Sequence, residues 1–213
     1  MTFQFPKLYP ILDASFIPSL DRAAFLHRLG SELTRSGVTL LEYRNKTGTE
    51  QELLADGKVL RQSMPAQYVK LILDDRADLI DQLGFDGVHV DAGDLTPTAA
   101  RSLLGPEKII GTFGGSESLV EGVLRQPADY FSIGPVFETR TKQTTKAPIG
   151  LAGVRRLRVA AGPGPVLVAV GGVTLASAAQ VLEAGASIVA VSAGIFAHPD
   201  PAAEFRRWTK ELA

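Results

Sequence analysis

Residues 166–191 read VLVAVGGVTLASAAQVLEAGASIVAV, which is an apolar run, an amphipathic run and a second apolar run. The apolar runs 166–170 and 188–191 have the length and composition of strands that are buried on both faces. The amphipathic run 175–184 fits a helix, and Gly185 follows it as glycine commonly follows a helix C-terminus. The stretch therefore predicts one strand–helix–strand unit of a parallel sheet.

The same alternation continues through the whole chain. The segments predicted as strands are Leu8–Leu12, Thr39–Tyr43, Tyr68–Leu73, Gly87–Val90, Lys108–Gly111, Tyr130–Ile133, Val166–Val170 and Ile188–Val191. The segments predicted as helices are Asp21–Ser36, Glu50–Met64, Ala77–Leu83, Thr96–Leu104, Ser118–Arg125, Leu151–Ala160, Leu175–Ala184 and Pro201–Leu212. Strict alternation of this kind is typical of a (β/α)8 TIM barrel, whereas a flavodoxin-like open sheet needs fewer units. We expect a single domain over residues 1–213, since no linker divides the chain.

The composition is that of a globular protein. With 213 residues, of which 45% are hydrophobic and 21% charged, the chain is neither disordered nor membrane-embedded in type. Its formal net charge is −1 with both signs interspersed, so no global field would attract nucleic acid or a membrane. The absence of cysteine excludes disulfides, thiolate nucleophiles and cysteine-based metal sites. We expect a cytoplasmic protein that acts on small molecules, and a homo-oligomer is left open.

The second predicted strand ends in Glu42-Tyr43-Arg44-Asn45-Lys46. Side chains alternate across a strand, so Glu42, Arg44 and Lys46 would share one face. In a barrel that face looks into the lumen at the C-terminal mouth, where active sites lie. Two neighbouring cations need compensation, either from an anionic ligand or from Glu42. A solvated strand end is the alternative.

Carboxylates follow the next two predicted strands. Asp74 and Asp75 end the third strand, and Asp94 comes shortly after the fourth. Mg²⁺ typically takes one or two protein carboxylates and completes its shell with water and phosphate oxygens, which fits Asp75 and Asp94. Helix capping is the alternative for each of them. His89, inside the fourth strand, is more typical of a hydrogen-bonded packing residue than of a catalyst.

The loop of residues 134–142, after the sixth predicted strand, reads GPVFETRTK. The hydroxyl groups of Thr139 and Thr141, the nearby backbone N–H groups and the cations Arg140 and Lys142 supply the donors that a phosphate or diphosphate needs. An exposed polar loop with no ligand would have a similar composition.

The loops after the seventh and eighth predicted strands carry Gly171-Gly172 and Ser192. In many barrels these loops hold a phosphate through backbone N–H groups. The glycines would permit a close backbone approach, and the Ser192 hydroxyl would add a donor. Phe113 lies in a glycine-rich stretch after the fifth strand, which is either a tight turn or part of a pocket wall.

Together these segments resemble the thiamine phosphate synthase family over nearly the whole chain. The motifs that carry the resemblance are Arg44-x-Lys46, Asp75, Gly87-Val88-His89, Asp94, Ala128-Asp129-Tyr130, Gly134-Pro135-Val136-Phe137, Thr139-x-Thr141-Lys142, Gly171-Gly172 and Val191-Ser192. The resemblance implies a barrel enzyme that joins 4-amino-2-methyl-5-hydroxymethylpyrimidine diphosphate to a thiazole phosphate. In that family the pyrophosphate leaves first, and the thiazole nitrogen captures the resulting pyrimidine-methyl cation.

The resemblance also implies a role for each matching residue. Mg²⁺ would be held by Asp75 and Asp94, the diphosphate by Arg44, Lys46, Thr139, Thr141 and Lys142, and the thiazole phosphate by Gly172 and Ser192. Catalysis is expected from Arg44, Lys46 and Lys142. Substrate binding is expected from Glu42, Asp74, His89, Phe113, Thr139, Thr141, Gly171, Gly172, Val191 and Ser192.

Departures from the family pattern are concentrated in the pyrimidine pocket. The family's usual Gln, Asn, Gln and Ser are replaced there by Glu42, Asp74, Ala92 and Phe113, and its usual Pro is replaced by Glu138. Two other functions are compatible with the same fold. A thiazole tautomerase works without diphosphate or metal, but it carries a catalytic His where this chain has Gly115. A non-catalytic sensor of a phosphate ligand is the other alternative.

Overall fold

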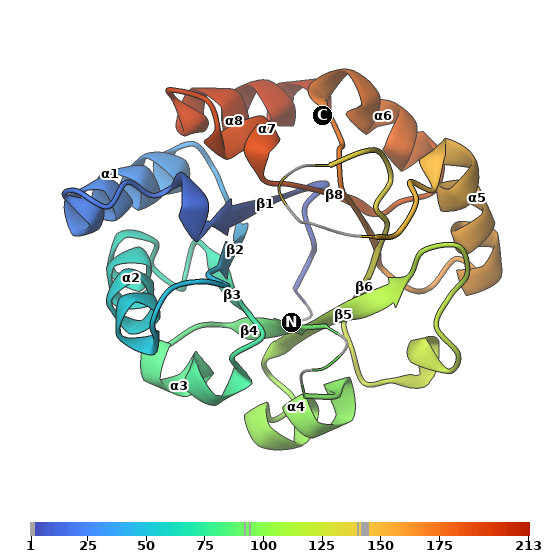
Figure 1. The fold of residues 1–213 in the computed structure, drawn as a ribbon, viewed down its shortest axis with the longest axis horizontal. Coiled ribbons are helices and arrows are strands. Elements are labelled where there is room, and N and C mark those ends of the chain that lie inside the picture. Colours follow the sequence, from blue (N-terminus) through green and yellow to red (C-terminus); the bar gives the residue numbers. More distant parts are fainter. Residues whose placement is uncertain (1–2, 92, 94, 140, 142–144) are drawn as a thin grey trace.

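The computed structural model describes residues 3–91, 93, 95–139, 141 and 145–213, and its eight parallel strands close into a barrel. The strands are β1 (Leu8–Asp13), β2 (Leu40–Arg44), β3 (Lys70–Asp74), β4 (Gly87–Val90), β5 (Ile109–Gly115), β6 (Tyr130–Ile133), β7 (Leu167–Val170) and β8 (Ile188–Val191). Each strand pairs with its neighbour in chain order, and β8 pairs with β1. This closure confirms the predicted TIM barrel and excludes the open sheet (Figure 1).

Helices surround the barrel on its outer side (Figure 1). They are α1 (Arg22–Arg35), α2 (Glu50–Ser63), α3 (Ile80–Leu83), α4 (Pro97–Leu104), α5 (Gly150–Ala161), α6 (Leu175–Glu183), α7 (Ala193–Phe196) and α8 (Pro201–Glu211), with 3-10 helices η1 (Ala14–Phe16), η2 (Ala77–Leu79) and η3 (Val123–Arg125). The helix predicted over Ala77–Leu83 is divided between η2 and α3. The short helix α7 was not predicted, because four residues are too few to show a helical period.

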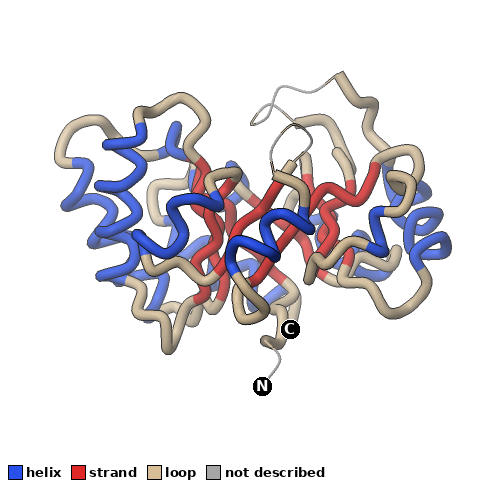
Figure 2. Tube along the Cα trace, turned by 90° about the horizontal axis from the view of Figure 1, so that it is seen from below, coloured by secondary structure: helices blue, strands red, loops and turns tan. Residues whose placement is uncertain are grey.

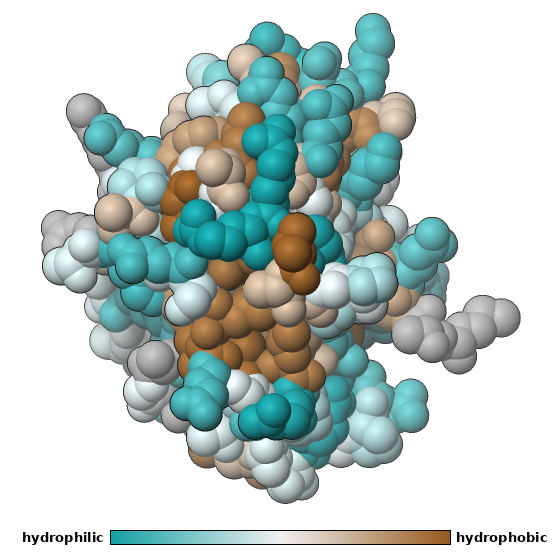
Figure 3. All heavy atoms as spheres, turned by 90° about the vertical axis from the view of Figure 1, so that its right-hand side faces the viewer, coloured by the Kyte–Doolittle hydropathy of each residue, from teal (hydrophilic) through white to brown (hydrophobic). Residues whose placement is uncertain are grey.

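The helix predicted over Ser118–Arg125 is wrong, since only its last three residues form a helix, η3. Strand β5 continues to Gly115, which forms an antiparallel bridge with Leu119. Gly122 then adopts a φ of 70°, which a right-handed helix excludes. An irregular segment therefore covers the barrel between β5 and β6. Figure 3 shows this side of the molecule, where apolar side chains gather at the centre of the face.

Side chains alternate between the outer core and the lumen of the barrel. The residues that fill the lumen are Tyr9, Leu40, Ile72, Ile109, Tyr130, Val168, Ile188 and Ala190. Two residues further along their strands, Glu42 and Asp74 take the next inward positions, and His89 does so on β4. The sequence pattern therefore places polar side chains directly above an apolar layer inside the barrel.

Parallel strands bring all the strand carboxyl ends to one end of the barrel. The last residues of the protein lie at the other end, where Lys7 Nζ donates to the carbonyl oxygen of Leu212 at 2.7 Å (Figure 2). In the part of the sequence that the structure describes, no helix combines the length and apolar character needed to cross a membrane.

Candidate active site

A cavity of about 730 Å³ lies at the carboxyl ends of the strands. The sequence-predicted residues that line it are Glu42, Arg44, Asp74, His89, Phe113, Thr139, Thr141, Gly171, Gly172, Val191 and Ser192. Lys46 and Asp75 do not line the cavity but adjoin it, because both neighbour Asp74, Lys46 through an ion pair and Asp75 along the chain. Ala92, Asp94, Arg140 and Lys142 lie outside the described residues. The structure thus brings together all ten residues predicted to bind substrate, from widely separated parts of the chain.

The two cations at the end of β2 are compensated by three carboxylates. Arg44 forms an ion pair with Asp13 and lies 3.6 Å from Asp74 Oδ2. Lys46 Nζ lies 2.8 Å from the same Asp74 oxygen and also pairs with Asp75. The sequence predicted compensation by an anionic ligand or by Glu42, whereas these aspartates supply it. The prediction missed Asp13 because it ends β1, whose remaining residues are apolar or aromatic.

Burial and pairing act in opposite directions on these groups. Burial disfavours the ionised form of Asp13, but hydrogen bonds from Ser15 and Arg44 hold its pKa below the usual value. Burial alone would lower the pKa of Lys46, whereas Asp74 and Asp75 keep it above its ordinary value. For Asp74 burial dominates and raises the pKa, although His89 and Lys46 oppose the shift. An incoming anion would therefore meet Lys46 in its charged form.

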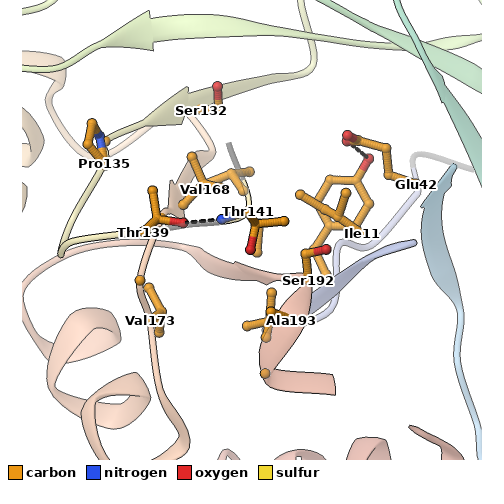
Figure 4. Close-up of a pocket in the computed structure, with 18 of the residues that line it drawn as sticks. Ile11, Glu42, Ser132, Pro135, Thr139, Thr141, Val168, Val173, Ser192 and Ala193 are labelled. Atoms are coloured by element: carbon orange, nitrogen blue, oxygen red, sulfur yellow. Dashed lines mark hydrogen bonds between the residues drawn. The ribbon is translucent and has the colours of Figure 1, made fainter. Parts of the chain in front are cut away.

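The cavity floor is a chain of hydrogen bonds between four strands. Tyr9 Oη donates to Glu42 Oε2 at 2.9 Å and lies 3.1 Å from Tyr130 Oη, which is 3.1 Å from His89 Nδ1 (Figure 4 shows the Glu42 contact). The His89 ring stacks on Tyr130 at 5.5 Å between centroids. His89 is thus a hydrogen-bonded packing residue, as the sequence indicated, and it also lines the cavity.

Glu42 is the buried carboxylic acid of this floor. Its side chain is buried, with 4% of the residue exposed. Burial raises its pKa to about 8, and the nearby charge of Asp74 adds to the shift. The hydrogen bond from Tyr9 and the charge of Arg44 oppose it. Near neutral pH, Glu42 is therefore able to act as a hydrogen-bond donor as well as an acceptor.

The sequence prediction gave no role to the two tyrosines of the floor, Tyr9 and Tyr130, although Tyr130 belongs to a motif of the family resemblance. Each occupies an inward position of an otherwise mainly apolar strand, and each is 1% exposed. The available signal was a side chain with a polar tip at a lumen-facing position, since a buried tyrosine hydroxyl usually requires a partner. Gly111 makes room for Tyr130, because a Cβ there would lie 1.9 Å from its ring.

The described residues of the loop after β6 contribute to the cavity wall. Thr139 and Thr141 both line the cavity, and the Thr141 backbone N–H donates to Thr139 Oγ1 at 3.4 Å (Figure 4). Lys146, which the sequence prediction did not include, places its ammonium group 3.5 Å from the centre of the Phe113 ring. This cation–π contact joins the far end of the loop to β5. Phe113 also lines the cavity, so it is part of the cavity wall and not only of a turn.

Gly171 and Gly172 are required by the neighbouring loop. A Cβ at Gly172 would lie 2.3 Å from the backbone oxygen of Glu138, and one at Gly171 would lie 2.7 Å from Pro135 Cβ. Backbone hydrogen bonds of 2.9 Å from Val136 to Val170 and from Phe137 to Gly171 hold the two loops together. The sequence predicted these glycines for a close approach to phosphate. The close approach that the structure shows is to the loop after β6.

Substitution of Gly172 by alanine is expected to lower the free energy of unfolding by about 1–3 kcal/mol. The added Cβ would collide with the backbone oxygen of Glu138, and the φ of 65° at this position is unfavourable for any L side chain. Urea unfolding would measure the loss. The matched control is Gly164→Ala, because a Cβ at Gly164 meets no atom within 4 Å and its φ lies outside the left-handed region. Equal stability of the two variants would contradict the prediction.

Ser192 is the polar group at the end of β8. Its Oγ atom is buried and has no hydrogen-bond partner among the described residues. Ser192 and Val191 line the cavity, and in Figure 4 Ser192 lies between the labelled side chains of Ile11 and Ala193. A buried hydroxyl group without a partner is costly, so a ligand at this position would satisfy it.

Comparison with known proteins extends over the whole barrel. The family model described as thiamine monophosphate synthase matches residues 8–195. The protein is 39% identical over 195 residues to the thiamine-phosphate synthase of Koribacter versatilis, covering 91% of this chain and 90% of that protein. It is 35% identical over 193 residues to that of Agrobacterium fabrum, covering 89% and 86%. Its fold is similar to that of thiamine phosphate pyrophosphorylase from Pyrococcus furiosus, with a TM-score of 0.75, 27% identity and coverage of 97% and 96%. Since the match begins with β1 and continues past β8, it includes every strand end that lines the cavity, and the chain belongs to the thiamine monophosphate synthase family.

Proposed function

We propose that this protein is a thiamine phosphate synthase, which condenses 4-amino-2-methyl-5-hydroxymethylpyrimidine diphosphate with 4-methyl-5-(2-phosphoethyl)thiazole and releases pyrophosphate. The observation that carries the proposal is the arrangement of charge at the cavity. Arg44 and Lys46 lie at one side of the barrel mouth, and Thr139 and Thr141 belong to the loop after β6, which contributes to the cavity wall. Such a set of cations and hydroxyl groups matches a diphosphate leaving group.

The proposed chemistry requires neutralisation of charge more than it requires a general base. As the bond from the pyrimidine methylene carbon to the diphosphate oxygen breaks, negative charge grows on the diphosphate. Arg44, released from Asp13 and Asp74, would place two parallel N–H donors on it. Lys46 would add a second positive charge. The thiazole nitrogen would then form the new bond to the methylene carbon.

Asp75 fits a divalent cation. Its Oδ1 atom is buried and has no hydrogen-bond partner among the described residues, and its backbone has a left-handed φ of 67°. We propose that Asp75 and Asp94 hold Mg²⁺, which when bound would supply positive charge to the phosphate oxygens. Asp94 lies outside the described residues. Within them, no group of three acidic or histidine side chains lies together in a metal-binding arrangement.

The rest of the cavity suits the two heterocycles. We propose that the Glu42 carboxyl group and His89 contact the pyrimidine at the floor, where Phe113 forms part of the wall. Ser192 is proposed to bind the thiazole phosphate, because its buried hydroxyl group has no partner in the described part of the sequence. Gly171, Gly172 and Val191 would shape this side of the cavity. We also propose that residues 1–213 act as one domain, with the cytoplasm as the expected compartment.

The thiazole tautomerase alternative is less favoured by the site. Gly115, at the position of that enzyme's catalytic histidine, ends β5 and bridges Leu119, so it offers no side chain for proton transfer. The carboxylates and cations around Arg44 would have no role in a reaction without diphosphate.

Incubation of the purified protein with both substrates and Mg²⁺ tests the proposal. We expect thiamine phosphate and pyrophosphate in equal amounts, and loss of turnover when the metal is removed by a chelator. Binding of the thiazole phosphate without any product would support the sensor alternative. Isomerisation of a thiazole phosphate in the absence of pyrimidine diphosphate and metal would support the tautomerase. Either of the last two results would refute the synthase.

A further inference from the structure

An ion pair between a partly exposed arginine and a buried aspartate lies behind the site, on the outer face of β2 and away from the cavity. Arg22 of α1 donates to Asp56 of α2 through two atoms, Nε to Oδ1 at 2.8 Å and Nη2 to Oδ2 at 2.6 Å. Asp56 is 3% exposed. Helices α1 and α2 lie side by side next to β2 (Figure 1). The proposed reaction does not use this pair, and neither residue lines the cavity.

A directed series of hydrogen bonds joins this pair to the loop after β2. The hydroxyl group of Tyr43 donates to Asp56, so its oxygen is left to accept the bond from Asn45 Nδ2 at 3.2 Å. Asn45 Oδ1 in turn accepts the backbone N–H of Gly48 at 2.7 Å. The series therefore begins at a charge pair shared by two helices and ends on the backbone of the loop.

This hydrogen-bond series and the two cations of the site occupy opposite faces of the same segment. Tyr43 and Arg44 are successive residues of β2, so their side chains point to opposite faces, Tyr43 towards the helices and Arg44 towards the barrel mouth. Beyond the strand end, the contacts of Asn45 with Tyr43 and of Lys46 with Asp74 keep the same division. The loop also wraps closely around Asn45, since a Cβ at Gly48 would lie 2.4 Å from Asn45 Nδ2. A shift of Asn45 would consequently move the residue on each side of it.

Stability alone does not explain such a cluster, because apolar residues of similar volume often replace a buried ion pair without loss. A satisfied polar network instead selects one conformation. We propose that Tyr43 and Asn45 are positioning residues that hold Arg44 and Lys46 in the geometry needed to grip a diphosphate, with the Arg22–Asp56 pair as their anchor. This inference rests on the proposed function, because it takes the diphosphate as the ligand of those cations.

The test compares the affinity for inorganic pyrophosphate in the presence of Mg²⁺, measured by calorimetry. For Tyr43→Phe and Asn45→Ala we expect pyrophosphate binding about ten- to a hundredfold weaker than in the unchanged protein. Small displacements of the binding side chains have effects of about this size. The KM for the pyrimidine diphosphate should rise similarly, while the KM for the thiazole phosphate should not change. Tyr43→Phe leaves the Arg22–Asp56 pair intact, which keeps this variant able to fold.

The matched control is Arg61→Met. Arg61 also belongs to α2 and pairs with Asp86, but that cluster lies beside the first residues of β3, where Lys70 Nζ is 2.8 Å from Asp86 Oδ1. The control should lose stability without loss of pyrophosphate affinity. Unchanged affinity in both test variants, or equal weakening in the control, would overturn the inference. If the unchanged protein binds no pyrophosphate, the proposed diphosphate site itself is refuted, and this inference with it.

Discussion

Replacement of Arg44 by methionine should lower kcat about a hundred- to a thousandfold, the usual cost of removing one group that stabilises charge in a transition state. Arg44 lines the cavity beside the proposed diphosphate position, and its guanidinium fork has no equivalent in a lysine. The same change would leave Asp13 without its ion pair and Asp74 with Lys46 alone. We therefore also expect the free energy of unfolding to fall by roughly 1–3 kcal/mol.

Steady-state kinetics with the pyrimidine diphosphate and urea unfolding would measure the two effects separately. Arg206→Met is a suitable control, since Arg206 is exposed and donates to Ser36 on the surface. It should keep full activity and stability. A loss of stability in Arg44→Met with an unchanged kcat would show that Arg44 serves only to compensate the aspartates.

The second large effect is a pH-dependent change in the free energy of unfolding, which we expect for Glu42→Gln. Burial raises the pKa of Glu42 from an ordinary value of 4.5 to about 8. Between these values the folded protein holds a proton that the unfolded chain has released, so the free energy of unfolding decreases as the pH rises. Below pH 4.5 Glu42 does not lower the free energy of unfolding. Above pH 8 the full cost of burying its ionised carboxylate lowers that free energy. Glutamine does not ionise, and it can still accept the hydrogen bond from Tyr9.

The variant should therefore match the unchanged protein at about pH 4 and be more stable at about pH 8.5, by an amount on the order of a few kcal/mol. Thermal or urea unfolding at several pH values would show this difference. A decrease with pH should persist in the variant, because burial raises the pKa of Asp74 as well. Glu107→Gln removes an equal charge from an exposed position and is the control. Parallel pH profiles for Glu42→Gln and the unchanged protein would contradict the assignment.

The local pattern of the sequence predicted most of the architecture. Period-two alternation placed Glu42, Arg44 and Lys46 on one face of a strand, and the structure puts Glu42 and Arg44 in the wall of the cavity. The family resemblance extended this to Thr139, Thr141 and Ser192, which line the same cavity. The shared face of Glu42, Arg44 and Lys46 could be predicted because these residues are close in the sequence, where backbone geometry alone determines which side chains share a face.

What the sequence could not determine were the partners of those side chains. Asp13 meets Arg44 only because β1 pairs with β2, and Tyr9 meets Tyr130, 121 residues later, only because the barrel closes. The same limit explains the wrong helix at Ser118–Arg125, where the extension of β5 and the left-handed Gly122 take precedence over local helical spacing. The sequence by itself thus determined the strand order and the polar strand ends. Tertiary structure alone decided which charges compensate one another and which acid is buried, because contact and desolvation are properties of the closed barrel.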